Sequence, residues 1–526
     1  MDGVHQPPAD TLDAAHTRAE LANLRPDLLK HFDAALPSAN AAVLARLLGA
    51  LRREPLPDLT DRGPHPAEGL FRATFTHHRI VIFPTSAAPT HLDATISAEG
   101  RDDRTITEPG ALARYLWPHA ALAAELDNSV ANLALAQAAA AETQQTGDEL
   151  QTAEGDPDGL GRLEQLVLDG HPLHPCCRTR EGLTPQDVLT YAPEHRVRVR
   201  LSKLAVPPER WRGDGPPILL AHPWQARRLR EEHPWLRDAG ETEPMRPLMS
   251  LRTFAPTDGG PHVKTAVDVR MTSAVRTVSP AAVHNGPRLS TLLRKLTHDL
   301  PITVLTETHA GHVVIDGVPQ RRLAHLIREA PRPQPGEAIL PLGALGAGST
   351  PLIVQAVRRA GAGPYTWLED LARIWLPPLI TVLDRGVALE AHGQNTLVGL
   401  RRGRPVRLLY RDFGGVRVSP ARLGHDPGLR GDLVCDDPAE LRAKLAAGAL
   451  GTVAGQLVTL LQRHLDAKPA RLWEIISDAI RRTGTRDGEN LLTEPVPVKA
   501  TTAMRLADDP LDDVWCHLDN PMAGAR

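Results

Sequence analysis

The N-terminal part of the chain has the hydrophobic pattern of helices. Between residues 11 and 55, apolar residues recur at steps of three and four, the spacing of an apolar helix face. Pro26 and Pro37 are expected to break this stretch into shorter helices. A helix rich in Ala and Leu is predicted from about 118 to 143. The acidic stretch 146–161 is interpreted as a loop or mobile linker and as the first candidate domain boundary.

Strand-like patterns dominate the middle of the chain. Residues 70–98 look β-like, with an apolar strand over 80–83 that ends at Pro84. From 163 to about 290, short strand-like pieces alternate with turns rich in His, Pro and Arg. The pieces are 197–201, 218–220 and 265–270.

A strong helix opens the last third of the chain. Apolar residues from Trp367 to Leu383 fall on or near one face, and Gly386 marks the end of the helix. Pro377 and Pro378 are expected to kink or split it. Two short strands and two helical stretches are predicted to follow: 387–390, 405–412, 438–465 and 470–482.

Composition narrows the class of protein. The 526 residues suggest two to four packed units, and the hydrophobic share of 42% is enough for a large core. The net charge of −3 argues against nucleic acid as a partner, because neutralising phosphates needs a basic surface. The 4 cysteines include no CxxC pair and predict no disulfide framework. No apolar leader and no run of 18 apolar residues is found, so we expect a cytoplasmic protein without a membrane partner.

The densest polar cluster, residues 390–395, comes directly after an apolar strand. Glu390 and Asn395 lie in it, and Asp412 begins an Asp-Phe-Gly sequence after the next apolar run. Two acids and an amide at neighbouring strand ends can bind Mg²⁺ through oxygen and leave room for phosphate oxygens. Protein kinases use the same logic in their catalytic loop and Asp-Phe-Gly segment. The alternative is a polar β-hairpin with a buried carboxylate.

Two histidines lie in a proline-rich segment that precedes two arginines. His171 and His174 each stand before or between prolines that stiffen the loop. A zinc site is one interpretation, but no HExxH motif and no third ligand at metal spacing accompanies them. Histidine beside Arg178 and Arg180 suits phosphate binding better, and a purely structural loop is the alternative.

Hydroxyl and basic residues gather between 247 and 277. In an extended strand, Ser250 and Arg252 would share one face. Together with Lys264 and Arg276 on neighbouring strands, they would clamp a triphosphate or a carboxylate. The alternative is a solvated arginine face.

Other sequence patterns say less about function. The sequence His222-Pro223-Trp224-Gln225 is interpreted as the packed start of a helix. The glycines between 343 and 348 are interpreted as an ordinary loop, and no GxxxxGK[ST] or GxSxG motif occurs.

Taken in order, these segments resemble one family: the aerobactin-synthetase-like (IucA/IucC) enzymes, or nonribosomal-peptide-synthetase-independent (NIS) siderophore synthetases. The C-terminal helical part resembles the ferric-reductase-like (FhuF-like) region of that family. The matching stretches are 170–175 with Arg180 and Gly182, 222–225, 250–253, Lys264 with 272–276, 390–395, and Arg411-Asp412.

The resemblance implies an α+β fold of three parts, likened to fingers, palm and thumb, with a distantly kinase-like palm. The expected parts are an N-terminal helical and β (thumb-like) region over 1–155, a fingers-like β-rich ATP-binding region over 156–355, and a palm with a helical FhuF-like region over 356–526.

The resemblance also implies a reaction. A carboxylate of citrate or a related polycarboxylic acid attacks the α-phosphate of MgATP, and an amine or alcohol then attacks the acyl-adenylate. The implied catalytic residues are Lys264, Arg276 and His392. The implied ATP-binding residues are His174, Ser250, Arg252, Thr253, Lys264, Gln394, Asn395 and Asp412. The implied Mg²⁺ ligands are Glu390, Asn395 and Asp412.

The chain departs from the family pattern at Arg178, where the family usually has Lys, and its N-terminal region resembles little else. The resemblance leaves the acid and the nucleophile open and makes a homodimer plausible. A kinase-like phosphotransferase is the runner-up, against which the missing Gly-rich loop counts. A non-catalytic protein that binds citrate-like ligands is the third interpretation.

Overall fold

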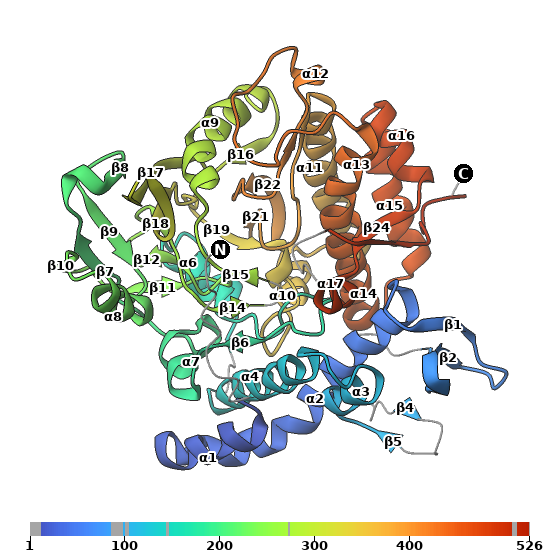
Figure 1. Ribbon diagram of the computed structural model, residues 1–526. Coiled ribbons are helices and arrows are strands. Elements are labelled where there is room, and N and C mark those ends of the chain that lie inside the picture. Colours follow the sequence, from blue (N-terminus) through green and yellow to red (C-terminus); the bar gives the residue numbers. More distant parts are fainter. Residues whose placement is uncertain are drawn as a thin grey trace.

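A computed structural model describes residues 12–85, 98–99, 105–143, 147–271, 274–507 and 513–524. The fold mixes helices and sheets throughout (Figure 1). The N-terminal helices lie at the bottom of this view, the strands of the middle region at the left, and the C-terminal helices at the right. Part of the predicted β region, 86–97, and the residues Thr272 and Ser273 lie outside the described residues.

Two long helices build the N-terminal core. Pro26 interrupts the helical stretch as predicted, but Pro37 lies inside one continuous helix, so the predicted break there is wrong. The second half of this helix, α2, is buried against α4, and this packing outweighs the hydrogen bond that proline removes. The N-terminal helices are α1 (Ala14–Leu24), α2 (Leu29–Arg53), α3 (Pro109–Leu116) and α4 (Leu122–Glu142). An antiparallel sheet packs beside α2 and α3, with β1 (Leu59–Pro64), β2 (Leu70–Phe75), β3 (Ile80–Pro84), β4 (Ala98–Glu99) and β5 (Thr105–Ile106).

The acidic stretch, which the structure describes over 147–161, is not a mobile linker. It contains the short helices α5 (Glu149–Ala153) and α6 (Gly159–Glu164). Leucines between the acids are buried in the core, and Arg359 forms ion pairs with Asp148 and Glu154. The acids are therefore neutralised across the fold, which composition alone does not reveal.

Residues 180–328 form the β-rich middle region. A sheet of six strands in the order β11-β12-β13-β18-β17-β8 carries it. The predicted strand 218–220 is confirmed as β9, whereas 197–201 forms only one bridge at Val199 and β7 starts after it. The helices are α7 (Pro185–Tyr191) and α8 (Pro223–Glu232). The strands are β6 (Arg180–Glu181), β7 (Ser202–Ala205), β8 (Trp211–Gly213), β9 (Ile218–Ala221), β10 (Arg237–Glu241), β11 (Met245–Pro247), β12 (Thr253–Pro256), β13 (His262–Thr265), β14 (Arg270–Met271), β15 (Ala274–Val275), β17 (Glu307–Ile315) and β18 (Val318–Arg328).

A second sheet, in the order β16-β22-β21-β19, lies beside the predicted central helix, α11. α11 is one helix through Pro377 and Pro378, so the predicted split is wrong; Trp367 and Trp375 anchor it in the largest core cluster. The strands are β16 (Ile302–Val304), β19 (Glu337–Pro341), β21 (Thr396–Arg401) and β22 (Arg404–Tyr410). The helices are α9 (Pro280–Leu296), α10 (Leu352–Ala360) and α11 (Pro364–Asp384).

Helices dominate the C-terminal part, as predicted. A π-helical segment, Ala447–Ala454, joins α13 to α14 without a break. The helices are α12 (Pro420–Leu423), α13 (Pro438–Ala446), α14 (Gly455–Leu465), α15 (Pro469–Arg481), α16 (Arg486–Thr493) and α17 (Thr501–Leu506). The strand pairs are β20 (Val387–Ala388) with β23 (Arg417–Val418), and β24 (Val496–Lys499) with β25 (Trp515–Leu518).

The C-terminal segment returns to the N-terminal core. Val498, Ala500 and Cys516 are buried in the same hydrophobic cluster as α2 and α4. The Glu54 carboxylate at the end of α2 accepts hydrogen bonds from the backbone N–H groups of Thr502 (2.8 Å) and Ala503 (2.9 Å). The two ends of the described chain thus stabilise each other.

Two helical stretches of the described residues, Pro26–Arg53 and Pro438–Leu465, are long and apolar enough to cross a membrane by composition alone. In the most apolar window of each, 72% and 61% of the residues are buried inside the protein. Burial in the core accounts for their hydrophobicity.

Candidate functional site

One large cavity, of about 1590 Å³, lies between the middle region, the β16-β22-β21-β19 sheet and the C-terminal segment. Every residue to which a role was assigned from the sequence lines it. These residues are His174, Ser250, Arg252, Thr253, Lys264, Arg276, Glu390, His392, Gln394, Asn395 and Asp412. Their convergence from three distant stretches defines the candidate active site.

An ion pair between Lys264 and Asp412 joins the two sheets at the cavity. Lys264 lies on β13, and its Nζ is 2.7 Å from Oδ2 of Asp412, which follows β22. Asp412 has a left-handed backbone (φ 72°), and its Oδ1 accepts a hydrogen bond from the Gly414 N–H. Burial opposes ionisation of Asp412, but Lys264, with Arg328 and Arg252, holds the pKa of this carboxyl far below its usual value.

Ser250 and Arg252 lie in a tight turn before β12, so the predicted extended strand is wrong here. Leu251 between them is buried and left-handed (φ 63°), and Ser250 Oγ accepts from the Thr253 N–H. The Arg252 guanidinium donates to the carbonyl oxygens of Arg276 (3.2 Å) and Thr277 (2.8 Å). Burial, together with Arg276, lowers the pKa of Arg252 to about 10, so it stays cationic at neutral pH.

The polar loop after β20 places Glu390 and His392 side by side. Glu390 Oε2 lies 3.8 Å from His392 Nε2, and Oε1 lies 3.2 Å from the Nζ of Lys444. Burial raises the pKa of Glu390, but Lys444 and His392 outweigh it and the net pKa is lowered. Burial lowers the pKa of His392, although Glu390 opposes this, so the ring is neutral at pH 7. Its Nδ1 accepts from the Gln394 N–H, which leaves the proton on Nε2.

The same loop is fixed by close backbone packing and by a buried ion pair. A Cβ on Gly393 would lie 2.8 Å from the backbone of Gly343, so the predicted ordinary loop around 343 is a packing surface for the site. Arg411 lies 2.6 Å from Glu164 and donates through Nε to the Gln394 carbonyl oxygen. Arg411, quoted among the family-like residues, therefore holds the loop in place.

The histidine loop, residues 170–180, contains a histidine that lines the cavity and two buried arginines. His174 Nδ1 accepts from the Cys176 N–H, and burial lowers the pKa of His174 well below its usual value. The ring is therefore a neutral Nε2–H donor. Arg178 and Arg180 are buried and both pair with Glu194, which explains why an arginine is accommodated at position 178.

The described residues contain no group of three or more His, Cys, Asp or Glu side chains that could hold a metal ion. The zinc interpretation of His171 and His174 thus finds no support there. Glu390, Asn395 and Asp412 offer oxygen donors of the kind that Mg²⁺ prefers. Because both carboxylates already contact lysines, Mg²⁺ would need further oxygen ligands, such as phosphates, to compete.

Several charged residues at the cavity escaped the sequence reasoning. Arg328 on β18 donates to His262 Nδ1, and burial lowers the pKa of Arg328 to about 10. Lys444 on α13 and Lys499 on β24 also line the cavity. None of the three lies in a recognisable motif, so their only sequence signal is a single basic residue in an apolar setting.

Comparison with known proteins agrees with this geometry. The profile of the IucA / IucC family matches residues 160–216 and 210–347. The profile described as "Ferric iron reductase FhuF-like transporter" matches residues 365–510. The two profiles together span the residues that line most of the cavity.

Two relatives and one solved structure extend the comparison. Staphyloferrin A synthase of Staphylococcus aureus is 26% identical over 441 residues, covering 69% of this chain and 73% of the relative. D-ornithine--citrate ligase of the same species is 22% identical over 474 residues, covering 70% and 71%. The fold is similar to that of ATP-bound aerobactin synthetase IucA from Klebsiella pneumoniae, with a TM-score of 0.75, 20% identity, and coverage of 93% of this chain and 99% of that one.

The fold, the cavity and these relatives define an enzyme of the ligase class. The chain belongs to the IucA / IucC family of NIS siderophore synthetases.

Proposed function

We propose that the protein activates a carboxylate of citrate or a related polycarboxylic acid with ATP and joins it to an amine or alcohol in siderophore biosynthesis. The convergence of all eleven predicted residues on one cavity carries this proposal. The names of the relatives, staphyloferrin A synthase and D-ornithine--citrate ligase, support the substrate class. The ATP-bound state of the IucA neighbour supports the nucleotide.

The cationic side of the cavity suits the triphosphate. Arg252, Lys264 and Arg328 lie around Asp412, so positive charge exceeds negative charge there. Ser250 and Thr253, at the adjoining turn, add hydroxyls, and neutral His174 adds an N–H donor. Because like charges must approach each other, a carboxylate reaches a phosphate only where cations offset their repulsion.

Asp412 and Asn395 are the residues we assign to Mg²⁺, with Glu390 joining them if it leaves Lys444. Mg²⁺ bound there would neutralise phosphate charge and polarise the phosphoryl group. Lys264, on losing Asp412 as its partner, would turn its ammonium towards the phosphates.

We assign Arg276 and His392, which both line the cavity, to the acid substrate. Burial lowers the pKa of Arg276, whereas Glu390 and Asp412 favour its charged form, and its guanidinium donates to the Met271 carbonyl oxygen at 3.1 Å. Nε2 of the neutral His392 ring lies 3.8 Å from Glu390 Oε2. We expect Arg276→Ala and His392→Ala each to lower turnover by about 10²-fold, as for the loss of one preorganised charge stabiliser. Near-normal rates in both variants would remove these residues from the mechanism.

The same proposal includes a division into fingers, palm and thumb at 155 and 355 and a kinase-like ancestry of the palm. It also includes a cytoplasmic location and a homodimer. The convergence of cavity residues from the middle and C-terminal parts supports the division into fingers and palm.

ATP–pyrophosphate exchange in the presence of Mg²⁺, across a panel of polycarboxylic acids, tests the reaction. Exchange stimulated by one acid is the expected result and identifies the acyl substrate. ADP formation without exchange would instead establish a phosphotransferase. Absence of any nucleotide turnover across the panel would contradict the proposed enzyme.

A further inference from the structure

The carboxylate of Glu164, at the end of α6, contacts two separate parts of the cavity wall. Its side chain is fully buried, and Oε2 accepts a hydrogen bond from the backbone N–H of Met249 at 3.1 Å. Oε1 lies 2.6 Å from a guanidinium nitrogen of Arg411. Met249 comes shortly after β11 and Arg411 directly after β22, both line the cavity, and the two strands belong to different sheets. One buried acid therefore joins the two sheets at the candidate site.

Met249 belongs to a turn that carries a residue assigned to the phosphates. The Leu251 N–H donates to the Leu248 carbonyl oxygen at 2.8 Å, so residues 248–251 form a β-turn with Met249 in its second position. The N–H at that position takes no part in the hydrogen bond of the turn, and Glu164 provides its acceptor. Ser250 is the next residue. Glu164 thus holds this phosphate turn, residues 248–253, against α6.

Arg411 transmits the other contact of Glu164 to the polar loop, residues 390–395. Its Nε donates to the Gln394 carbonyl oxygen at 3.0 Å, and its backbone N–H donates to the Asn395 carbonyl oxygen at 3.0 Å. The Arg411 side chain is buried, and burying a guanidinium is unfavourable unless negative charge accompanies it. Glu164 supplies that charge and so keeps Arg411 against the loop.

The helix that carries Glu164 is fixed between the two sheets. On the side of the middle region, the next residue, Gln165, donates to the Val197 carbonyl oxygen at 2.9 Å and accepts from Arg246 at 2.9 Å. Arg246 also binds both carboxylate oxygens of Asp158, at 2.6 and 2.7 Å. On the other side, Leu160 packs in one hydrophobic cluster with residues of β19, β21 and β22. Glu164 therefore has a defined position relative to both sheets.

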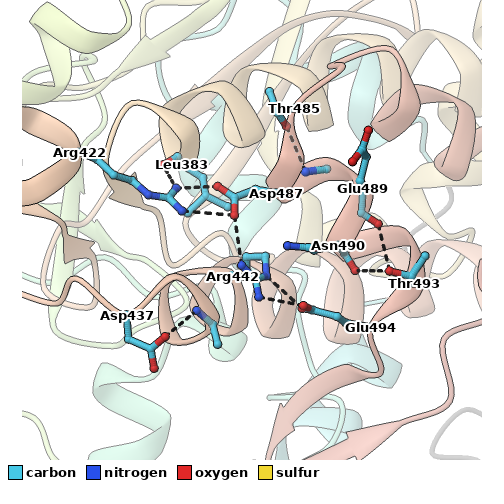
Figure 2. Close-up of polar contacts among 12 residues, drawn as sticks. Leu383, Arg422, Asp437, Arg442, Thr485, Asp487, Glu489, Asn490, Thr493 and Glu494 are labelled. Atoms are coloured by element: carbon cyan, nitrogen blue, oxygen red, sulfur yellow. Dashed lines mark hydrogen bonds and ion pairs between the residues drawn. The ribbon is translucent and has the colours of Figure 1, made fainter.

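Another buried carboxylate shows what is particular about Glu164. Asp487 on α16 lies 2.6 Å from Arg422 and 3.4 Å from Arg442, and Arg442 also binds Glu494. Figure 2 shows this network, whose acids and arginines all lie between residues 422 and 494. It stabilises the C-terminal part internally. Glu164 instead connects the middle region to the β16-β22-β21-β19 sheet, across the cavity that separates them.

We propose that Glu164 is a positioning residue that sets the separation between the phosphate turn and the polar loop. The inference rests on the proposed function, in which the turn binds phosphates and the polar loop and Asp412 hold Mg²⁺. A magnesium nucleotide would span both, so the two sheets must keep a fixed spacing for its phosphates and its metal ion to be bound together. Glu164 touches neither ligand and acts through Met249 and Arg411.

Glu164→Gln tests this role with little change in side-chain size. The amide replaces one acceptor oxygen by a donor, which then faces either the Arg411 guanidinium or the Met249 N–H. Calorimetric titration with α,β-methylene-ATP and Mg²⁺ measures nucleotide binding without turnover. We expect the affinity for this analogue to fall by about 10-fold and the kcat of ATP–pyrophosphate exchange to fall by about 10- to 100-fold, because small displacements of positioning groups are costly.

Glu337→Gln is the matched control for the loss of a buried acid. Glu337 is fully buried, its carboxylate lies 2.6 and 2.8 Å from nitrogens of Arg407, and it accepts from the Gln334 N–H at 2.7 Å. None of these three residues lines the cavity. The Glu337 variant should lower the Tm about as much as Glu164→Gln does. Its analogue affinity and exchange kcat should stay within about 2-fold of the wild type, which separates positioning from stability.

Met249→Pro removes the second contact without leaving a buried charge unpaired. Proline suits the second position of a β-turn and lacks the N–H that Glu164 accepts. We expect analogue affinity to fall by about 3- to 10-fold, as for the loss of one hydrogen bond, whereas Met249→Leu keeps the N–H and should change it by less than about 2-fold. The double variant with Glu164→Gln should bind no more weakly than Glu164→Gln alone, because both changes act on one contact. Met249→Pro also carries the test if Glu164→Gln does not fold.

Wild-type affinity and exchange rate in folded Glu164→Gln would overturn the positioning role, as would equal losses in Glu337→Gln. Met249→Pro with wild-type affinity, or a wild-type protein that does not bind the analogue, would overturn it as well. The proposed reaction fails by a different observation, the absence of pyrophosphate exchange in the wild type with every acid. Nucleotide binding by the variants is measured independently of that outcome.

Discussion

Gly448, in the π-helical segment after α13, lies against the backbone of His392. A Cβ on Gly448 would stand 2.7 Å from the His392 nitrogen and 2.8 Å from the carbonyl carbon of Ala391. Both contacts are with backbone atoms, so the polar loop would have to move as a whole. The absence of a side chain at Gly448 thus allows the backbone of His392 to take its observed position.

Gly448→Ala is therefore expected to displace His392 and to lower pyrophosphate-exchange kcat by about 10-fold or more, since small misplacements of catalytic groups are costly. Overpacking should also destabilise the protein by about 1–3 kcal/mol. Gly455→Ala is the matched control, because Gly455 continues the same helical run with no atom within 4 Å of an added Cβ. It should be neutral or stabilising by about 0.5–1 kcal/mol. Equal activity of the two variants would contradict the role of this contact.

Gly415 makes a comparable contact with a side chain. A Cβ there would lie 2.0 Å from Glu390 Oε2, so Gly415→Ala should push the carboxylate off its position beside His392. We expect a lower kcat and a higher KM for the acid, measured by pyrophosphate exchange. The neighbouring Gly414→Ala would meet only Asp412 Oδ1 at an ordinary 3.5 Å and should keep both constants near those of the wild type. A similar loss in both variants would indicate a general loop effect.

Lys264 is expected to contribute to activity through its own positive charge and through its ion pair with Asp412. Lys264→Ala removes the cation that lowers the pKa of Asp412, so that pKa rises towards its ordinary range. It also removes the ammonium that we propose to bind the phosphates, and we expect exchange to fall by about 10²-fold with a higher KM for ATP. Lys203→Ala, on β7 away from the cavity, is the control and should change neither value. An unaltered KM for ATP in Lys264→Ala would argue against its placement at the phosphates.

Glu307 on β17 predicts a pH effect on stability. Burial raises the pKa of Glu307 from 4.5 to about 7, in spite of Lys264 nearby. Between these two values the folded protein binds more protons than the unfolded chain, so this group lowers stability as pH rises and the full penalty applies above pH 7. Glu307→Gln should therefore gain up to about 3 kcal/mol relative to the wild type on going from pH 5 to pH 8. Urea denaturation at both pH values measures the difference.

An exposed glutamate provides the comparison for that measurement. Glu231→Gln on α8 should show the same offset from the wild type at pH 5 and pH 8. If Glu307→Gln behaves in the same way, the carboxyl of Glu307 does not carry the proton that its burial implies.

Much of the site could be predicted because its residues lie in short motifs whose order along the chain is informative. Asp412 and Asn395 are predicted to lie close together because each follows an apolar run of the sequence. In the structure, β21 begins directly after Asn395 and β22 ends just before Asp412, and these two strands are adjacent in one sheet. The roles of these residues remain predictions. Lys444 and Lys499 could not be found in this way, because a lone lysine in a helix or at a strand end has no local pattern.

The errors in the fold have a common physical cause. Local propensity predicts breaks at Pro37 and Pro377, yet both prolines lie in helices whose burial stabilises them through tertiary contacts. The acidic stretch around Asp148 and Glu154 was interpreted as a linker because its partner, Arg359, is distant in sequence. Long-range pairing of this kind leaves no trace in a local window.

The return of the C-terminal segment to α2 has a consequence for how the protein is made. On the ribosome, the strands of the middle region emerge first, while the cavity wall with Lys499 and Trp515 is synthesised long afterwards. Until the Glu54 carboxylate accepts hydrogen bonds from the backbone N–H groups of Thr502 and Ala503, the cavity lacks the wall that the C-terminal segment forms. A nascent chain would therefore have the cavity wall of the middle region long before the cavity is closed, and the enclosed site would form only after the C-terminal segment has been synthesised.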